Sequence, residues 1–541
     1  MKKVIVKFIA ALLLPALLLA AVSCNKSEIT PTVTKQQNEI IIFHDSAFEK
    51  SIRELLEKLE GDIYSNDVKD IKKLDLGNKG IITISDLKWF ISLENLNMGN
   101  SEEGTSPNAI SDINVLGYLV NLSELSFSRN NIIYISVLKS CKKLVSLDLS
   151  FNSITDISSL KPLQNLKALN LSWNPIDDFS ALEELKNIST LDLSTIIVSQ
   201  ENRLTDINFI SDLTNLTKLN LDWNSISDFR PLKNLTKIEE LSLASNEISN
   251  IDMIGNLINL TTLDLSWNPN LDIEPLKNLI KLEKLSINEC GLQNIDSLSG
   301  LANLKSLIAN QNSIKDIQSV KNLKKLEVLD LAVNNITDIS SISELINLKE
   351  LDLFSNSIEN INSLENLKKL EILDLMMNKI QNIDSISGLT NLKELGLYVN
   401  KITDIKPLKN LTKLEGLQLE NNKIRNIDSI AGLTNLTVLS LSYNSITEIK
   451  PLKNLIKLDY LYIDNNRIQN IDTLGGIINL KSLIAGNNSI TNIKSLEKLT
   501  KLKILLLEGN PIEDYSPVNS YYDKLEYRDF GPDPIYMVEG D

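Results

Sequence analysis

A repeat of 22 residues is the feature that most constrains how this 541-residue chain can fold. Residues 144–165 (LVSLDLSFNSITDISSLKPLQN) place leucine or isoleucine at seven spaced positions around Asn152, and residues 166–187 repeat the pattern. The asparagine position then recurs every 22 residues from Asn224 to Asn510, and we count about twenty repeats in all. A fixed period of this length is the signature of a solenoid, in which each repeat is one structural unit.

One repeat cannot be stable alone, because its few apolar side chains do not offset the entropy of ordering its backbone. Stacked repeats share a continuous core, so the array can be stable where one unit is not. The segment LxLxxN predicts a short strand, and the later IxxI predicts a tight convex turn. The asparagine lies where the strand must turn, and its amide can satisfy the backbone groups of that buried loop.

This pattern resembles that of leucine-rich repeat proteins, and its N-x-I-x-D-I-x-x-L-x-x-L segment most resembles the internalin-like bacterial surface proteins. The resemblance implies an α/β solenoid, a curved horseshoe with a parallel concave β-sheet and short convex turns or 3-10 segments. It also implies caps at both ends. FHDSAFEKSIRELLEKL predicts a helical N-terminal cap that begins at Asp45 or Ser46, and EDYSPVNSYYDKLEYRDF predicts a C-terminal cap.

The N-terminus is typical of a secretory signal. Three lysines precede an uncharged run, residues 8–22, which is too short for a comfortable membrane span. The run ends in AVSC, which resembles a bacterial lipobox, although Ala21 stands where that motif prefers leucine. We therefore expect Cys24 to be lipid-modified, with ordinary signal cleavage as the alternative.

These features predict five segments and a location. The chain is expected in the bacterial cell envelope, anchored by lipid and exposed at the surface. The segments are a lipoprotein signal peptide (1–23), a flexible tether (24–37), an N-terminal helical cap (38–70), the leucine-rich repeat array (71–512), and a C-terminal cap and tail (513–541).

Two repeats carry extra residues directly after the strand, EEGTSPN after Ser101 and IVSQEN after Ile196. Such loops are tolerated on an edge, and the alternative is a raised rim beside a binding face. Cys141 stands at a core leucine position and Cys290 at an asparagine position. Six repeats separate the two cysteines, which is too far for a disulfide, so we predict that both are free and buried.

A second period of 44 residues underlies the first. It indicates that the array grew by duplicating pairs of repeats. Trp223 and Trp267 are 44 residues apart, and Trp173 is 50 before Trp223 because of the six-residue insert, so their spacing reflects ancestry. The motif PLKNL lies on the same grid, beginning at Pro231, Pro275, Pro407 and Pro451.

Side chains between and just after the strand leucines point out of the sheet and predict a binding surface. Exposed aromatic rings surrounded by charge are typical of protein-binding hot spots. We expect the three tryptophan rings to be exposed about 10 Å apart, with gaps at Thr195 and Ser245 that receive partner side chains. In the alternative, the rings only lean on their neighbours. The predicted partner-binding residues are Asp148, Phe151, Trp173, Asp192, Asp222, Trp223, Asp264, Trp267, Tyr398, Tyr443 and Tyr462.

Composition argues against several functions. A net charge of −15 disfavours nucleic-acid binding, because that binding requires lysine and arginine to neutralise phosphates. The only histidine is His44, so a zinc cluster or a histidine-dependent triad has few candidates. A cation could bridge two of Asp330, Asp352 and Asp374, but no loop completes such a site. We expect no enzymatic activity, no cofactor and no metal.

The leading functional prediction is a monomeric surface lipoprotein that binds a protein ligand, such as a host receptor or matrix component. An intracellular scaffold is one alternative, because phosphatase-regulating proteins share a similar 22-residue repeat. The signal sequence and Cys24 argue against it. A structural lipoprotein that organises the cell envelope is the other alternative.

Overall fold

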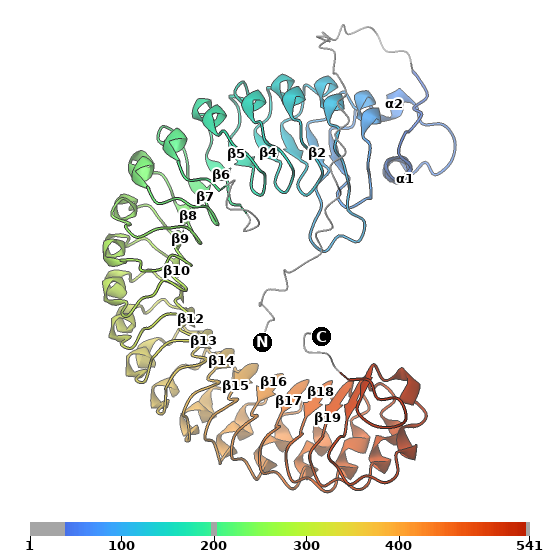
Figure 1. The fold of residues 1–541 in the computed structure, drawn as a ribbon, viewed down its shortest axis with the longest axis vertical. Coiled ribbons are helices and arrows are strands. Elements are labelled where there is room, and N and C mark those ends of the chain that lie inside the picture. The colour runs from blue at the N-terminus through green and yellow to red at the C-terminus, as the bar shows by residue number, and fades with distance from the viewer. Residues whose placement is uncertain (1–37, 196–202, 537–541) are drawn as a thin grey trace. The chain divides into compact units, whose positions relative to one another are not determined.

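The computed structural model describes residues 38–195 and 203–536. They form two compact units, of which unit 1 ends at Asn165 and unit 2 begins at Leu166. In each unit, short parallel strands alternate with 3-10 helices (Figure 1). The predicted α/β solenoid with a parallel sheet is confirmed. Cys24 and the insert after Ile196 lie outside the described residues.

Unit 1 begins with two short α-helices, α1 (Ser46–Leu55) and α2 (Ser65–Val68). Its strands pair in parallel in chain order, with leucine beside leucine at each step. The strands are β1 (Lys73–Asp75), β2 (Asn95–Asn97), β3 (Glu124–Ser126) and β4 (Ser146–Asp148). The 3-10 helices are η1 (Ser85–Trp89), η2 (Asn114–Tyr118), η3 (Ser136–Ser140) and η4 (Ser158–Leu160).

Asp45 fixes the start of α1, as one of the two predicted N-caps. Its Oδ1 accepts hydrogen bonds from Ala47 N and Phe48 N, both at 2.9 Å. Its Oδ2 accepts from Ile82 N at 2.8 Å and Thr83 N at 3.1 Å, which ties the helix to the first repeat. Burial opposes ionisation, yet these four N–H donors hold the pKa of Asp45 below its ordinary value.

Unit 2 contains seventeen strands in its described residues. They are β5 (Ala168–Asn170), β6 (Thr190–Asp192), β7 (Lys218–Asn220), β8 (Glu240–Ser242), β9 (Thr262–Asp264), β10 (Lys284–Ser286), β11 (Ser306–Ile308), β12 (Val328–Asp330), β13 (Glu350–Asp352), β14 (Ile372–Asp374), β15 (Glu394–Gly396), β16 (Gly416–Gln418), β17 (Val438–Ser440), β18 (Tyr460–Tyr462), β19 (Ser482–Ile484), β20 (Ile504–Leu506) and β21 (Tyr527–Arg528). All pair in parallel with their neighbours in the chain.

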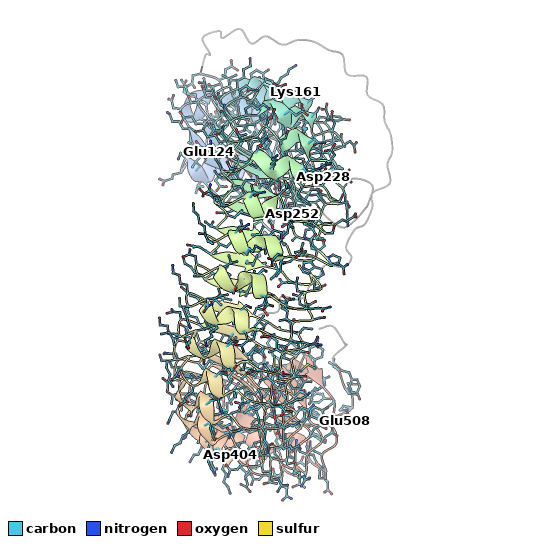
Figure 2. All side chains as sticks on the ribbon, turned by 90° about the vertical axis from the view of Figure 1, so that its left-hand side faces the viewer. Glu124, Lys161, Asp228, Asp252, Asp404 and Glu508 are labelled. Carbon is cyan, nitrogen blue, oxygen red and sulfur yellow. The ribbon has the colours of Figure 1, made fainter. Side chains whose placement is uncertain are left out.

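Short 3-10 helices return the chain from one strand of unit 2 to the next. The 3-10 helices lie on the side of the unit that faces the viewer in Figure 2, where Asp228 and Asp252 are labelled beside them. They are η5 (Ser180–Glu184), η7 (Asn208–Ile210), η8 (Arg230–Asn234), η9 (Ile254–Asn256), η10 (Glu274–Asn278), η11 (Asp296–Gly300), η12 (Gln318–Asn322), η13 (Ser340–Glu344), η14 (Asn362–Leu364), η15 (Asp384–Gly388), η16 (Lys406–Asn410), η17 (Asp428–Gly432), η18 (Lys450–Asn454), η19 (Asp472–Gly476), η20 (Lys494–Lys498), η21 (Ser516–Val518) and η22 (Tyr522–Lys524).

The repeat spacing explains the core. One strand leucine lies beside the next, as Leu329 does beside Leu351, so each repeat adds a layer to one continuous apolar interior. The apolar side chains of each repeat are buried almost completely. In the repeat that begins with β12, those exposed by 1% or less are Leu329, Leu331, Ile336, Ile339, Ile342, Leu345 and Leu348.

The asparagine ladder closes the loop that follows each strand. Asn334 Nδ2 donates to Ala309 O at 3.0 Å, Leu331 O at 3.1 Å and Ala332 O at 3.2 Å. Its Oδ1 accepts from Ile314 N at 2.9 Å. One buried side chain therefore joins two neighbouring repeats and satisfies backbone groups that have no strand partner, as the sequence predicts.

The first insert lies one residue earlier than predicted, because Asn108 is a ladder residue and not one of the extra residues. Asn108 Nδ2 donates to Leu76 O at 2.8 Å and Met98 O at 3.0 Å, and its Oδ1 accepts from Ile81 N at 2.8 Å. These are the ladder's hydrogen bonds. The ladder amide thus comes after the loop, and the added residues are 101–107.

Both interior cysteines are free and fully buried, as predicted. Burial raises the pKa of each thiol to about 11. Cys290 replaces the ladder asparagine, and its Sγ lies 3.2 Å from Leu265 O. A thiol at this pKa is a poor nucleophile, so both side chains serve the core.

The 44-residue period has a physical consequence at one edge of unit 2. In a strict 22-residue repeat, identical side chains would stack and lysine would face lysine, which is unfavourable. Alternation instead places a carboxylate beside each lysine. The pairs are Lys305 with Glu283 (2.7 Å), Lys349 with Glu327 (2.6 Å) and Lys393 with Glu371 (2.6 Å). Duplication of repeat pairs therefore also preserves charge balance along this edge.

The C-terminal segment covers the last repeat of unit 2. Strand β21 adds to β20, and Tyr521, only 1% exposed, donates its hydroxyl to Leu496 O at 2.8 Å. Arg528 is 7% exposed, and its guanidinium lies 4.3 Å from the centre of the Tyr522 ring. Nothing in residues 38–195 or 203–536 forms a helix long and apolar enough to cross a membrane.

We predict that Asn334→Ala lowers the free energy of unfolding by about 3 kcal/mol, because Ile314 N and three carbonyls lose their buried partner. Denaturation by guanidinium, followed by circular dichroism, measures the change. Asn335→Ala is the matched control, since Asn335 is the exposed neighbour. Equal loss in both variants would contradict a special role for the ladder amide.

Candidate functional site

In most repeats, the residue before the ladder position has a left-handed backbone conformation. Its φ is 59° at Trp173, 62° at Trp223 and 63° at Trp267. Glycine and asparagine tolerate this region best, whereas bulky side chains are disfavoured there. Later repeats of unit 2 use the tolerated type at the same position, in Asn421, Asn465 and Asn487. The turn therefore does not require a tryptophan.

The rings of Trp223 and Trp267 contact each other. Their centres lie 6.1 Å apart with an angle of 38° between the planes. The expected separation of about 10 Å, with a gap at Ser245, is wrong for this pair, because strand spacing fixes the backbone and the rings can lean toward each other over a small residue. Trp267 is 46% exposed, whereas Trp173 and Trp223 are half-buried, less exposed than expected.

Phe151, in unit 1, occupies the same position before the ladder asparagine as the tryptophans do, and an arginine side chain lies over its ring. The Arg129 guanidinium lies 3.8 Å from the centre of the Phe151 ring. Arg129 in turn pairs with Glu102 at 2.6 Å. The first insert thus contacts the predicted binding residue Phe151 through Arg129. This contact favours the prediction that the loop forms a raised rim beside the binding face.

The predicted aspartates between the strand leucines have a structural role. Asp148, Asp192 and Asp264 are half-buried, and each accepts a hydrogen bond from the backbone N–H two residues later, at 3.0, 3.0 and 2.9 Å. This bond shapes the turn toward the left-handed residue. Asparagine does the same at Asn97, Asn170 and Asn220.

Asp222 follows the second strand leucine of its repeat, whereas the other predicted aspartates lie between the two strand leucines. Its Oδ1 accepts from Ser242 Oγ and from Ala244 N, both at 2.7 Å. Burial raises the pKa of Asp222 to about 6 despite these donors, and the charges of Asp264 and Asp192 add to the shift. The carboxyl of Asp222 therefore loses its proton near pH 6.

Three further aspartates, absent from the predicted partner-binding set, lie side by side on the inner face of unit 2, which is the face of the sheet turned away from the 3-10 helices (Figure 1). Asp330 pairs in register with Asp352, and Asp352 with Asp374. Burial and the charge of Asp374 raise the pKa of Asp352 to about 7, and burial raises that of Asp374 to about 6. The sequence signal was three successive repeats with the same acid at one position.

The predicted tyrosines differ in exposure. Tyr443 is 58% exposed and has the left-handed backbone of the tryptophan column, with φ of 53°. Tyr398 and Tyr462 are half-buried and occupy other positions of their repeats, and burial raises the pKa of Tyr462. Of these three tyrosines, only Tyr443 has a largely exposed side chain.

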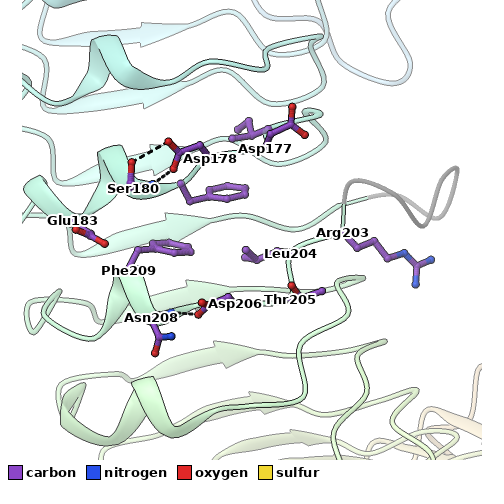
Figure 3. Close-up of a pocket in the computed structure, with 12 residues that line it drawn as sticks. Asp177, Asp178, Ser180, Glu183, Arg203, Leu204, Thr205, Asp206, Asn208 and Phe209 are labelled. Atoms are coloured by element: carbon purple, nitrogen blue, oxygen red, sulfur yellow. Dashed lines mark hydrogen bonds between the residues drawn. The ribbon is translucent and has the colours of Figure 1, made fainter.

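A pocket of about 390 Å³ lies beside the 3-10 helices η5 and η7 of unit 2 (Figure 3). Phe179 and Phe209 stack in it, with ring centres 5.4 Å apart. Asp178 accepts from Ser180 N at 2.8 Å, and Asp206 accepts from Asn208 N at 2.8 Å. None of the predicted site residues lines this pocket, and its lining residues include no histidine or cysteine.

The side chains that could support metal or histidine chemistry are used elsewhere or dispersed. In the part of the chain that the structure describes, no three histidine, cysteine, aspartate or glutamate side chains are placed to hold a metal ion. His44 Nδ1 lies 2.8 Å from Asp86 Oδ1, and His44 N donates to Oδ2 of the same carboxylate. The single histidine thus contacts a buried carboxylate of unit 1 while its own side chain is exposed.

Comparison with known families agrees with this geometry. A family model described as "Leucine Rich repeats (2 copies)" matches residues 120–162, 302–345, 346–389, 390–432, 434–476 and 478–520. A second, described as "Leucine Rich repeat", matches residues 163–178 and 212–228. Together the matches span slightly more than half of the chain. No curated protein matches it.

Among solved structures, a leucine-rich repeat protein of Leptospira interrogans is 29% identical, covers 70% of this chain and 93% of its own, and has a TM-score of 0.56. The ectodomain of the Arabidopsis receptor kinase HAESA, with a peptide hormone bound, is 26% identical over 74% of this chain and 72% of its own, with a TM-score of 0.59. The internalin inlF of Listeria monocytogenes is 28% identical over 78% of this chain and 95% of its own, with a TM-score of 0.38.

We predict that Asp352→Asn raises the unfolding temperature by about 2–4 °C at pH 8 and leaves it unchanged at pH 4. The folded-state pKa of Asp352 lies above its ordinary value. Its contribution to stability is therefore complete below about pH 4 and is lost as the pH rises through about 7. The asparagine keeps the acceptor for Phe354 N and cannot ionise.

Thermal unfolding followed by circular dichroism at both pH values measures this effect. Asp338→Asn is the control, since Asp338 is exposed and accepts from Ser340 N at 2.8 Å. The same gain at pH 4 and pH 8, or the same gain in the control, would show that ionisation of Asp352 is not its cause.

Proposed function

We propose, from the premise that this chain belongs to the leucine-rich repeat family, that it binds a protein ligand through the inner faces of its strands and catalyses no reaction. One observation carries the proposal. The Trp223–Trp267 pair occupies backbone positions that disfavour large side chains, and yet Trp267 is 46% exposed. A ring that the turn does not need and that remains exposed is best explained by contact with a partner.

The nature of the ligand has independent support. The HAESA ectodomain structure contains a peptide hormone, and its likeness to this chain extends over 74% of the sequence. Paired tryptophans present a large, rigid apolar area, which is the type of surface that dominates protein interfaces. The half-buried Asp222 and Asp264, in the same two repeats as these rings, would supply polar specificity.

We further propose that the protein is a bacterial surface lipoprotein, anchored through Cys24, whose role is adhesion or host interaction. The signal sequence and the AVSC motif support this location. An envelope-organising lipoprotein would share the anchor but would act on the cell's own surface. An intracellular scaffold would retain residues 1–23, so the mature N-terminus distinguishes it from both.

Cys24→Ala is predicted to abolish lipid attachment when the gene is expressed in a bacterium. Mass spectrometry of the N-terminal peptide and partition into Triton X-114 detect the lipid. Ser23→Ala is the control, because it preserves the thiol. A Cys24→Ala protein that still partitions into detergent, or a wild-type protein with residues 1–23 intact, would refute the anchor.

Trp223→Ala with Trp267→Ala is predicted to weaken ligand binding by about 30-fold or more for each residue, as hot-spot truncations cost about 2 kcal/mol or more. A photoreactive phenylalanine at Gln311, which is exposed with φ of 53°, first captures the ligand from an extracellular-matrix extract. Calorimetry with the captured protein then gives the affinities.

Trp89→Ala is the matched control, because Trp89 is also half-buried but lies on η1 of unit 1. Its affinity should equal that of the wild type. If the double variant binds as tightly as the control while both remain folded, the tryptophans are not a binding surface.

A further inference from the structure

Charge is distributed unevenly on the inner face of unit 2. From the first residue of each strand to the residue before the asparagine position, the ten segments of β11–β20 contain eight carboxylates and no lysine or arginine. Earlier segments of the unit do contain cations, as Lys218 and Lys284 show. The carboxylates are Asp330, Glu350, Asp352, Asp374, Glu394, Glu420, Asp464 and Glu508.

Three of these carboxylates are direct neighbours. Asp352 stands in register between Asp330 on β12 and Asp374 on β14, at the roughly 4.8 Å spacing of adjacent strands. Glu350 precedes Asp352 on the same face of β13. The edge of the unit alternates lysine with glutamate, so this stacking of like charge is a departure from the unit's own pattern.

The fold does not need these charges. Asp330, Asp352 and Asp374 each accept a hydrogen bond from the N–H two residues later, at 3.0, 2.8 and 2.9 Å. Asn170 and Asn220 make the same hydrogen bond within unit 2. Since a neutral amide satisfies the turn, the turn does not require three successive aspartates, whose charges repel one another.

Hydrogen-bond donors are few along this column, where Asn310 Nδ2 donates to Asp330 Oδ2 at 2.7 Å. Asp374 is 7% exposed and accepts one hydrogen bond, from Met376 N. Glu420 Oε2, on the same face, is buried without a hydrogen-bond partner. Buried carboxylate oxygens require donors. A ligand that brings both positive charge and N–H groups satisfies both needs.

We propose that this part of unit 2 binds a segment of the protein ligand that carries lysine or arginine side chains. The acidic face consists of Asp330, Glu350, Asp352 and Asp374, with the exposed Val333 and Met377 beside them. Guanidinium or ammonium groups pair with the aspartates, and their methylene stems pack on Val333 and Met377, which are 39% and 41% exposed. This inference rests on the proposed function, because it specifies the chemistry of the ligand.

Binding at the acidic face releases protons near neutral pH. The pKa of Asp352 is about 7, because of burial and then the charge of Asp374. The charged groups that face it are Asp330 from β12, Asp374 from β14 and Glu350 on its own strand. All are acidic, so a bound cation favours the ionised form of Asp352 and displaces its proton.

A fluorescent hexa-arginine peptide is the probe, with a hexa-glutamate peptide as the wrong-sign comparison. The full chain is expected to bind the arginine peptide and not the glutamate peptide. Replacing Asp330, Asp352 and Asp374 together by asparagine should weaken arginine-peptide binding by about tenfold or more. Calorimetry in two buffers of different ionisation enthalpy should show proton release at pH 7 that the triple variant loses.

Asp316→Asn, Asp338→Asn and Asp404→Asn together form the matched control. They remove the same number of carboxylates, and each carboxylate accepts the N–H two residues later, as asparagine does at Asn382 and Asn426. Asp404 is labelled in Figure 2. The control should bind the arginine peptide within about twofold of the wild type.

Equal weakening in both triple variants would overturn the proposal, because diffuse net charge would then explain binding. Competition by Ca²⁺ at micromolar concentration would overturn it too, since the face would then be a metal site. The peptide assay is independent of the ligand captured in the tryptophan experiment. Loss of one result therefore leaves the other standing, and the two proposals can fail separately.

Discussion

The asparagine ladder is the interaction on which the rest of this structure depends. Each ladder side chain joins two repeats through buried backbone groups, as Asn334 does between residues 309–314 and 331–332. The ladder closes the turn that follows each strand, and its hydrogen bonds persist across the first insert because Asn108 makes them. Side chains beside the ladder are then held at fixed positions, one layer per repeat.

Because the repeats share one geometry, the chain itself shows which residue each position prefers. The left-handed position accepts asparagine at Asn421 and Asn465, yet it holds tryptophan in three earlier repeats. The turn-shaping position accepts asparagine at Asn170, yet it holds three neighbouring aspartates at β12–β14. We propose that these departures mark two binding surfaces with different chemistry, one aromatic and one acidic.

Sequence reasoning reached far because the repeat fixes backbone positions. The ladder, the Asp45 cap and the two buried cysteines all follow from period and residue type. It failed where side chains move freely between fixed backbones. The approach of Trp223 to Trp267 depends on rotamers that strand spacing does not set. The raised pKa of Asp352 depends on burial and neighbours one repeat away, which a single strand segment does not display.

The most direct test of this account is the free energy of unfolding of a variant with five asparagines, at Trp223, Trp267, Asp330, Asp352 and Asp374. If these side chains serve recognition and not the fold, the variant should be within about 1 kcal/mol of the wild type or more stable at pH 8. A loss of about 3 kcal/mol or more would show that the rings and carboxylates hold the solenoid together, and would contradict the account.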